Sequence, residues 1–114
     1  MTNKATKLRI ADVKRHIFLC VNDGGAQKCC TPEQASDSWQ YLKARTAELG
    51  MLSEQGGSVF RSKAGCLRLC QNGPIAVVYP EGVWYENCST EVLEKIITNH
   101  LLLGKIVEEN VIKP

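Results

Sequence analysis

The sequence lacks the features that would place it at once in several common classes of protein. No apolar stretch is longer than a few residues, which excludes a membrane-spanning helix. The N-terminus has no long apolar region of the secretory type, so we expect a cytoplasmic protein. A C-x-x-C motif is absent, which disfavours a thioredoxin-type dithiol activity. Histidine occurs only at His16 and His100, both outside the cysteine-containing loops, and we expect structural roles for both.

The composition is that of one small globular domain. The chain has 114 residues, of which 44% are hydrophobic and 23% charged, enough for one modest core. The net charge of +2 is unevenly spread, because residues 1–15 carry five basic side chains against one acidic, a net +4, and the remainder carries −2. We expect residues 1–15 to form a basic, solvated arm before a domain of residues 16–114.

Hydrophobic periodicity and end signals predict two helices. The first begins at Thr31, whose side chain caps it while Gln34 completes a capping-box spacing, and Gly50 ends it. The second begins after Ser89 or Thr90 and ends at Gly104. One face of the first helix carries the residues expected to be buried, with Trp39 as a core anchor: Ala35, Trp39, Leu42, Thr46 and Leu49.

Four apolar runs predict strands near residues 16–21, 58–62, 75–79 and 83–85. The first run is almost continuously apolar, as in a strand buried on both faces. The strand–helix–strand order implies a parallel pair, and the short Pro80-Glu81-Gly82 connection implies an antiparallel hairpin. We therefore expect an α/β domain with a mixed four-stranded sheet flanked by helices, which is the element order of a thioredoxin-like fold.

The six cysteines contain the main functional signal. Cys20 can pair with Cys29 or Cys30 across one loop, and Cys66 and Cys70 form a C-x3-C motif in another. Four thiolates from two distant loops suit either an iron–sulfur cluster or a tetrahedral zinc ion. The long spacing in the first loop is awkward for a zinc knuckle, whereas the larger cluster tolerates it. Spacing alone therefore favours iron–sulfur without settling the choice.

A block after the second cysteine motif resembles a known family. From Cys66 the sequence reads C-L-R-L-C-Q-N-G-P, then an apolar strand, then Y-P-E-G-V-W-Y up to Tyr85. This pattern is similar to that of the thioredoxin-like [2Fe–2S] ferredoxins, and the similarity covers most of residues 16–112. In that fold a cis-proline occupies the position of Pro74. The loop after Cys20 is shorter than usual for the family and lacks its proline-rich stretch.

The resemblance implies a non-enzymatic, homodimeric electron carrier with one [2Fe–2S] cluster per subunit, which exchanges electrons with redox partner proteins and binds neither nucleic acid nor membranes. Matched residue by residue, it implies the ligands Cys20, Cys30, Cys66 and Cys70. Cys30 is preferred to Cys29 because it lies nine residues before Trp39, the family's distance to a helix aromatic.

Two further hypotheses use the same cysteines. One is a zinc-stabilised interaction module, and the other is a thiol-based redox sensor on the same fold. The remaining cysteine, Cys88, is expected to pack as a small hydrophobe near the start of the last helix.

Overall fold

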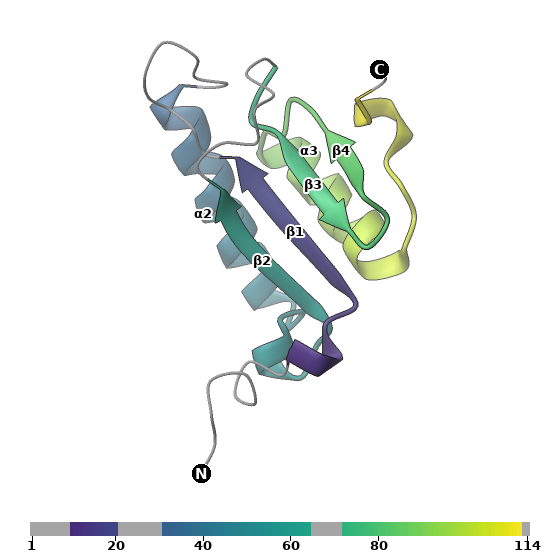
Figure 1. The fold of residues 1–114 in the computed structure, drawn as a ribbon. Coiled ribbons are helices and arrows are strands. Elements are labelled where there is room, and N and C mark those ends of the chain that lie inside the picture. The colour runs from purple at the N-terminus through teal and green to yellow at the C-terminus, as the bar shows by residue number, and fades with distance from the viewer. Residues whose placement is uncertain (1–9, 21–30, 65–71, 113–114) are drawn as a thin grey trace.

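A computed structural model describes residues 10–20, 31–64 and 72–112 of the chain. Its four strands form one mixed sheet, as the sequence predicts: β1 Arg15–Cys20, β2 Val59–Ala64, β3 Ala76–Tyr79 and β4 Val83–Tyr85. Their order in the sheet is β2-β1-β3-β4. β1 runs parallel to β2 and antiparallel to β3, and β3 and β4 form the expected antiparallel hairpin. Figure 1 shows the sheet with helices α2 and α3 behind it. Among the described residues, no helix is long and apolar enough to cross a membrane.

The first helix, α2, spans Pro32–Glu48 and begins as predicted. The Gln34 N–H donates to Thr31 Oγ1 at 3.1 Å, and the Thr31 N–H donates to Gln34 Oε1 at 2.9 Å, so both halves of the capping box are formed. The prediction that Leu49 is buried was wrong, because the helix ends at Glu48 and Leu49 is 40% exposed. Gly50 follows with a φ of +67°, the left-handed conformation that favours glycine after a helix.

The last helix, predicted as one regular element, has two parts. It begins as α3, Thr90–Lys95, where the Ser89 hydroxyl accepts from the Val92 N–H at 3.3 Å. It then widens into a π-helical stretch, Ile96–Leu101, before Gly104 with a φ of +76°. The predicted apolar stripe is buried throughout: Leu93, Ile96, Ile97, His100 and Leu101.

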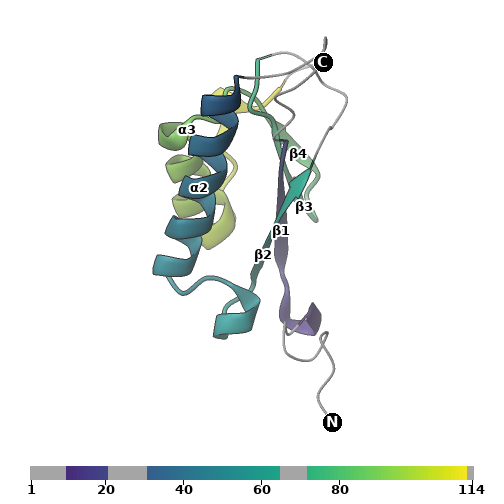
Figure 2. The ribbon, with the colours of Figure 1, turned by 90° about the vertical axis from the view of Figure 1, so that its left-hand side faces the viewer.

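The helices cover only one face of the sheet (Figure 2). That inner face carries Ile17 and Leu19 of β1, both wholly buried in the main core. On the outer face of β1, His16 and Phe18 are only half-buried, so the expectation of a strand buried on both faces was wrong. The near-continuous apolar run arises because this uncovered face is itself aromatic.

A chain of polar contacts connects β1, β4 and the last helix at the end of the fold opposite Cys20. Arg15, which the charge pattern assigned to the arm, opens β1 and donates to Glu81 at 3.0 Å. The hydrogen bond from Arg15, together with one from His100, holds the pKa of Glu81 below its ordinary value. Because the carboxylate can only accept, His100 Nε2 donates to it at 3.1 Å, and His100 Nδ1 is hydrogen-bonded to the Tyr85 hydroxyl at 2.8 Å. The Val107 N–H donates to the same hydroxyl oxygen at 3.1 Å, which secures the C-terminal segment.

Candidate functional site

Cys20 lies at the end of the sheet where several segments meet. It is the last residue of β1, is 2% exposed, and pairs in register with Ala64, the last residue of β2. Its N–H donates to the Ile75 carbonyl at 2.8 Å, and its side chain packs with Ile75 and Ala35 of the first turn of α2. Figure 1 shows the carboxyl ends of β1 and β2 and the amino end of α2 at the same end of the molecule. Elements that are far apart in sequence therefore converge around this thiol.

The other predicted ligands, Cys30, Cys66 and Cys70, lie outside the described residues, and so does the alternative Cys29. Thr31 follows the segment that contains Cys29 and Cys30, while Ala64 and Asn72 lie on either side of the segment that contains Cys66 and Cys70. Around Cys20, α2, which begins after Thr31, and β2, which ends at Ala64, come together. The described part of the chain thus supplies one thiol at this end of the sheet, that of Cys20, and the set of four thiolate ligands stays a prediction. Within residues 10–20, 31–64 and 72–112, no three His, Cys, Asp or Glu side chains gather as a metal site.

The 72–74 stretch is fixed against the start of the last helix. The Asn87 N–H donates to the Asn72 carbonyl at 2.7 Å, and the Cys88 N–H donates to the Pro74 carbonyl at 2.9 Å. The Gly73–Pro74 peptide bond is cis, in agreement with the position that the resemblance implied. These bonds fix the point at which the chain leaves the C-x3-C motif and enters β3.

Cys88 is part of the hydrophobic core, as predicted. It is wholly buried, and its thiol contacts the Glu86 carbonyl at 3.8 Å. Burial raises the pKa of the Cys88 thiol far above its ordinary value, so it stays protonated. A protonated core thiol is neither a metal ligand nor a redox nucleophile.

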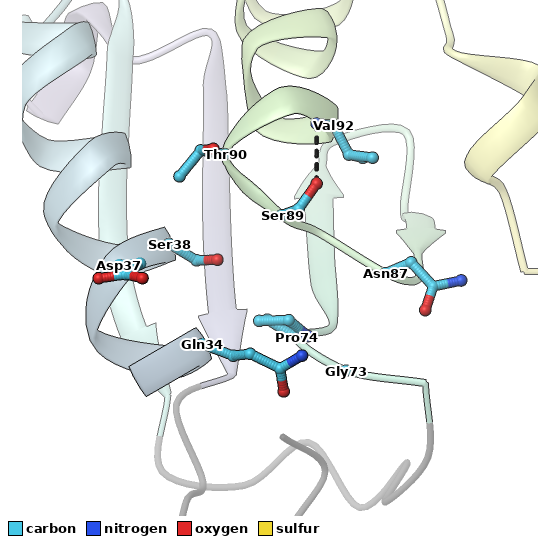
Figure 3. Close-up of a pocket in the computed structure, with 9 residues that line it drawn as sticks. All are labelled: Gln34, Asp37, Ser38, Gly73, Pro74, Asn87, Ser89, Thr90 and Val92. Carbon is cyan, nitrogen blue, oxygen red and sulfur yellow. Dashed lines mark hydrogen bonds between the residues drawn. The ribbon is translucent and has the colours of Figure 1, made fainter. Parts of the chain in front are cut away.

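A pocket of about 430 Å³ opens beside this end of the fold. Figure 3 shows it between the first turns of α2, the Gly73–Pro74 stretch and the start of α3, with Gln34 extending toward Pro74. Ser38 on its wall donates to the Cys88 carbonyl at 2.7 Å. Asp37 is the one charged side chain of its lining, and the lining contains neither a thiol nor a histidine.

Both histidines lie away from this site, as expected. His16 is on the outer sheet face, where its Nε2 and the Ser62 hydroxyl are 2.8 Å apart, and burial lowers its pKa. His100 is wholly buried in the polar chain described above.

One cluster was missed by the sequence analysis. Trp39 packs at the edge of the core, as predicted, but three cationic side chains also lie close to its ring: Lys43, Arg61 and Lys63. Two spacings could have indicated it, because Lys43 follows Trp39 by four residues on a helix and Arg61 and Lys63 alternate along a strand.

Comparison with curated proteins places the chain beside 2Fe–2S ferredoxins along most of its length. It is 33% identical to a ferredoxin of Clostridium pasteurianum over 98 residues, which cover 83% of this chain and 92% of the relative. It is 32% identical to a ferredoxin of Aquifex aeolicus, covering 86% of this chain and 88% of that protein. No protein-family model matches the chain.

Solved structures give the same result for the fold. The wild-type thioredoxin-like [2Fe–2S] ferredoxin of Aquifex aeolicus superposes with a TM-score of 0.73 at 30% identity, over 90% of this chain and 99% of that one. Two further structures are serine variants of that protein, altered at cysteines four positions apart. The second of them superposes with a TM-score of 0.76 at 29% identity, over 88% of this chain and 99% of its own.

Proposed function

The chain belongs to the thioredoxin-like [2Fe–2S] ferredoxin family, and from this premise we propose that it is a non-enzymatic one-electron carrier. The proposed cofactor is a single [2Fe–2S] cluster per subunit, ligated by Cys20, Cys30, Cys66 and Cys70. When bound, such a cluster takes up one electron from a donor protein and passes it to an acceptor. Redox partner proteins are accordingly the proposed partners, with no role for nucleic acid or membranes.

The observation that carries this proposal is the placement of Cys20. Its thiol lies at the convergence of β1, β2 and α2, and two of these elements border the segments that hold the other three proposed ligands. The spacing of Cys66 and Cys70 adds support, since serine variants of the Aquifex protein were made at cysteines with the same separation.

The described residues contribute burial and rigidity. The backbone bond from Cys20 to Ile75 and the pairing with Ala64 fix the end of β1, while apolar neighbours keep water from the Cys20 thiol. A ligand held on a rigid strand needs little rearrangement when the charge at the site changes by one electron. This is a suitable arrangement for a carrier, whose task is transfer without further chemistry.

The proposal is tested by the visible spectrum of protein purified without oxygen. We expect a red-brown protein with broad absorbance above about 400 nm that bleaches with dithionite, together with iron and sulfide in equal amounts. A colourless protein with stoichiometric zinc and no sulfide would contradict the proposal and favour the zinc module. A metal-free protein that forms reversible disulfides would instead favour the thiol sensor.

We further propose that the protein is a homodimer joined through the outer sheet face. His16 and Phe18 stack there with ring centroids 4.0 Å apart, and Phe60 and Tyr79 complete an aromatic surface. Tyr79 is 44% exposed, and no described helix covers this face (Figure 2). The lowered pKa of His16 favours a neutral ring at pH 7, which suits an apolar interface.

Introducing a charge on this face is expected to separate the subunits. In the native dimer Phe18→Glu would bury a carboxylate without a partner, so we expect dissociation to become at least about 100-fold easier. Sedimentation equilibrium should then give twice 12.6 kDa for the native protein and 12.6 kDa for the variant. Tyr79→Glu, at a more exposed position, should act in the same direction if Phe18→Glu fails to fold.

Leu103→Glu is the matched control, because Leu103 is 61% exposed and follows the π-helical stretch, away from the strands of the outer face. We expect it to remain dimeric. Dissociation by Leu103→Glu, with Phe18→Glu and Tyr79→Glu still dimeric, would place the interface elsewhere.

A further inference from the structure

Three cationic side chains surround one aromatic ring at the edge of the sheet. Lys43 Nζ lies 5.7 Å from the centroid of the Trp39 ring, Lys63 Nζ lies 5.9 Å from it, and Arg61 Cζ lies 6.0 Å from it. Each distance is within the range of a cation–π interaction. We call Trp39, Lys43, Arg61 and Lys63 the basic cluster.

The basic cluster arises from two elements that lie next to each other. Trp39 and Lys43 come from one face of α2, and Arg61 and Lys63 come from alternate positions of β2, the edge strand of the sheet. Arg61 is further held by a bond from its Nε to Thr46 Oγ1 at 3.2 Å. The arrangement is therefore fixed by secondary structure, and Lys63 is exposed at its surface.

No acidic side chain neutralises the cluster within the described part of the chain. The ion pairs found there involve Arg15, Arg45, Lys95 and His100, and none of the three cations of the cluster. The acidic residues of α2 lie at least about 120° around the helix from Trp39, at Glu33, Asp37 and Glu48. Like charges held together without a counter-charge repel one another, and an external anionic group relieves that repulsion.

The basic cluster also lies near Cys20, the one proposed iron–sulfur ligand within the described residues. Lys63 pairs with Leu19 and the next residue, Ala64, pairs with Cys20. With strands about 4.8 Å apart and about 3.3 Å per residue, the Lys63 backbone is within about 10 Å of the Cys20 backbone. A protein that binds here is brought to the end of the sheet at which electrons would enter and leave.

From these observations we propose that the basic cluster is the docking surface for an acidic face of a redox partner protein. The cations would attract carboxylates of the partner, and the Trp39 ring would give the contact an apolar centre. This inference rests on the proposed function, because a carrier gains from docking beside its cofactor. Electrostatic attraction of this kind raises association rates by about tenfold or more at low salt.

A short polyglutamate peptide serves as the first probe of this surface. We expect it to shift the NMR signal of the Trp39 indole N–H in ¹⁵N-labelled protein at low salt, and the shift to vanish at about 0.5 M salt. Lys43→Gln/Lys63→Gln should weaken peptide binding about tenfold. Arg61 is left in place, since its bond to Thr46 contributes to the fold.

Lys14→Gln/Lys105→Gln is the matched control, with the same loss of two charges from exposed positions outside the basic cluster. We expect it to bind the peptide as the native protein does. Equal weakening by both double variants would show a nonspecific charge effect and overturn the proposal. Tighter binding of oligothymidylate than of the peptide at the same residues would overturn it too, in favour of a nucleic acid site.

Electron transfer supplies a second readout. The reduced protein gives one electron to the anionic Co(III)–EDTA complex, which becomes Co(II), and no proton is transferred. Lys43→Gln/Lys63→Gln should slow this reaction about tenfold at low salt but not the reaction with cationic hexaamminecobalt(III). Equal rates for native and variant protein with both oxidants would contradict docking near the cofactor. Peptide binding needs no cofactor, so the two proposals can fail separately. A colourless protein would refute the proposed function, and the NMR titration would still show whether the basic cluster binds an acidic peptide.

Discussion

Cys30→Ser is expected to abolish the iron–sulfur signature or alter it strongly, whereas Cys29→Ser should leave it close to that of the native protein. A serine oxygen is a poorer ligand than a thiolate for this cofactor, so loss of a true ligand lowers cluster content or changes its spectrum. Iron and sulfide per chain, visible absorbance and the electron paramagnetic resonance spectrum of the reduced protein measure the difference. The choice of Cys30 comes from the family's distance to the helix aromatic, here Trp39.

Cys88→Ala provides a control for the loss of any cysteine. Because Cys88 lies in the core with a raised pKa, this variant should keep its iron and lose only some stability. Equal and mild effects of Cys29→Ser and Cys30→Ser would refute the assignment. A larger effect of Cys29→Ser would exchange the two roles.

The second large effect is expected at His100. Replacing this wholly buried side chain by alanine removes its volume and its bonds to the Tyr85 hydroxyl and to Glu81, which keep only the Val107 N–H and Arg15 as partners. We expect a loss of about 3 kcal/mol in the free energy of unfolding, which corresponds to a fall of roughly 10–15 °C in Tm. Thermal and urea unfolding followed by circular dichroism measure both quantities.

Asn99→Ala is a suitable control for His100→Ala, because Asn99 belongs to the same π-helical stretch, but the hydrogen bonds of its side chain go to its own helix, to the Lys95 carbonyl and the Thr98 hydroxyl. It should cost less than about 1 kcal/mol. The folded His100→Ala protein should keep the native visible spectrum, since His100 lies at the end of the fold opposite Cys20. A cost for His100→Ala no greater than for Asn99→Ala would show that the polar chain contributes little.

Local signals in the sequence predicted much of the fold. The capping box at Thr31 and Gln34 forms as expected because both of its bonds join residues three positions apart. The hairpin after Tyr79 follows from short-range backbone preferences in the same way, and so do the helix ends at Gly50 and Gly104. Such features depend on neighbours in the chain and so can be inferred from it directly.

Features that depend on distant residues could not be predicted. The apolar run in β1 reads the same whether its second face meets helices or remains an aromatic surface, and only the arrangement of the elements decides this. The bonds joining Arg15, Glu81, His100 and Tyr85 connect residues up to 66 positions apart. For the candidate site, the position of Cys20 agrees with its predicted place at a strand end, and the assignment of the other ligands stays a prediction.

The segment from residue 21 to residue 30 begins and ends at anchored points. Cys20 is fixed by its backbone bond to Ile75 and its pairing with Ala64, and Thr31 is fixed by its capping box. Both sets of bonds join residues outside the segment, and doubling a loop's length costs only about 0.6 kcal/mol of closure entropy. A change in the spacing between Cys20 and Thr31 would therefore cost little free energy of folding as long as the strand and the helix keep these bonds.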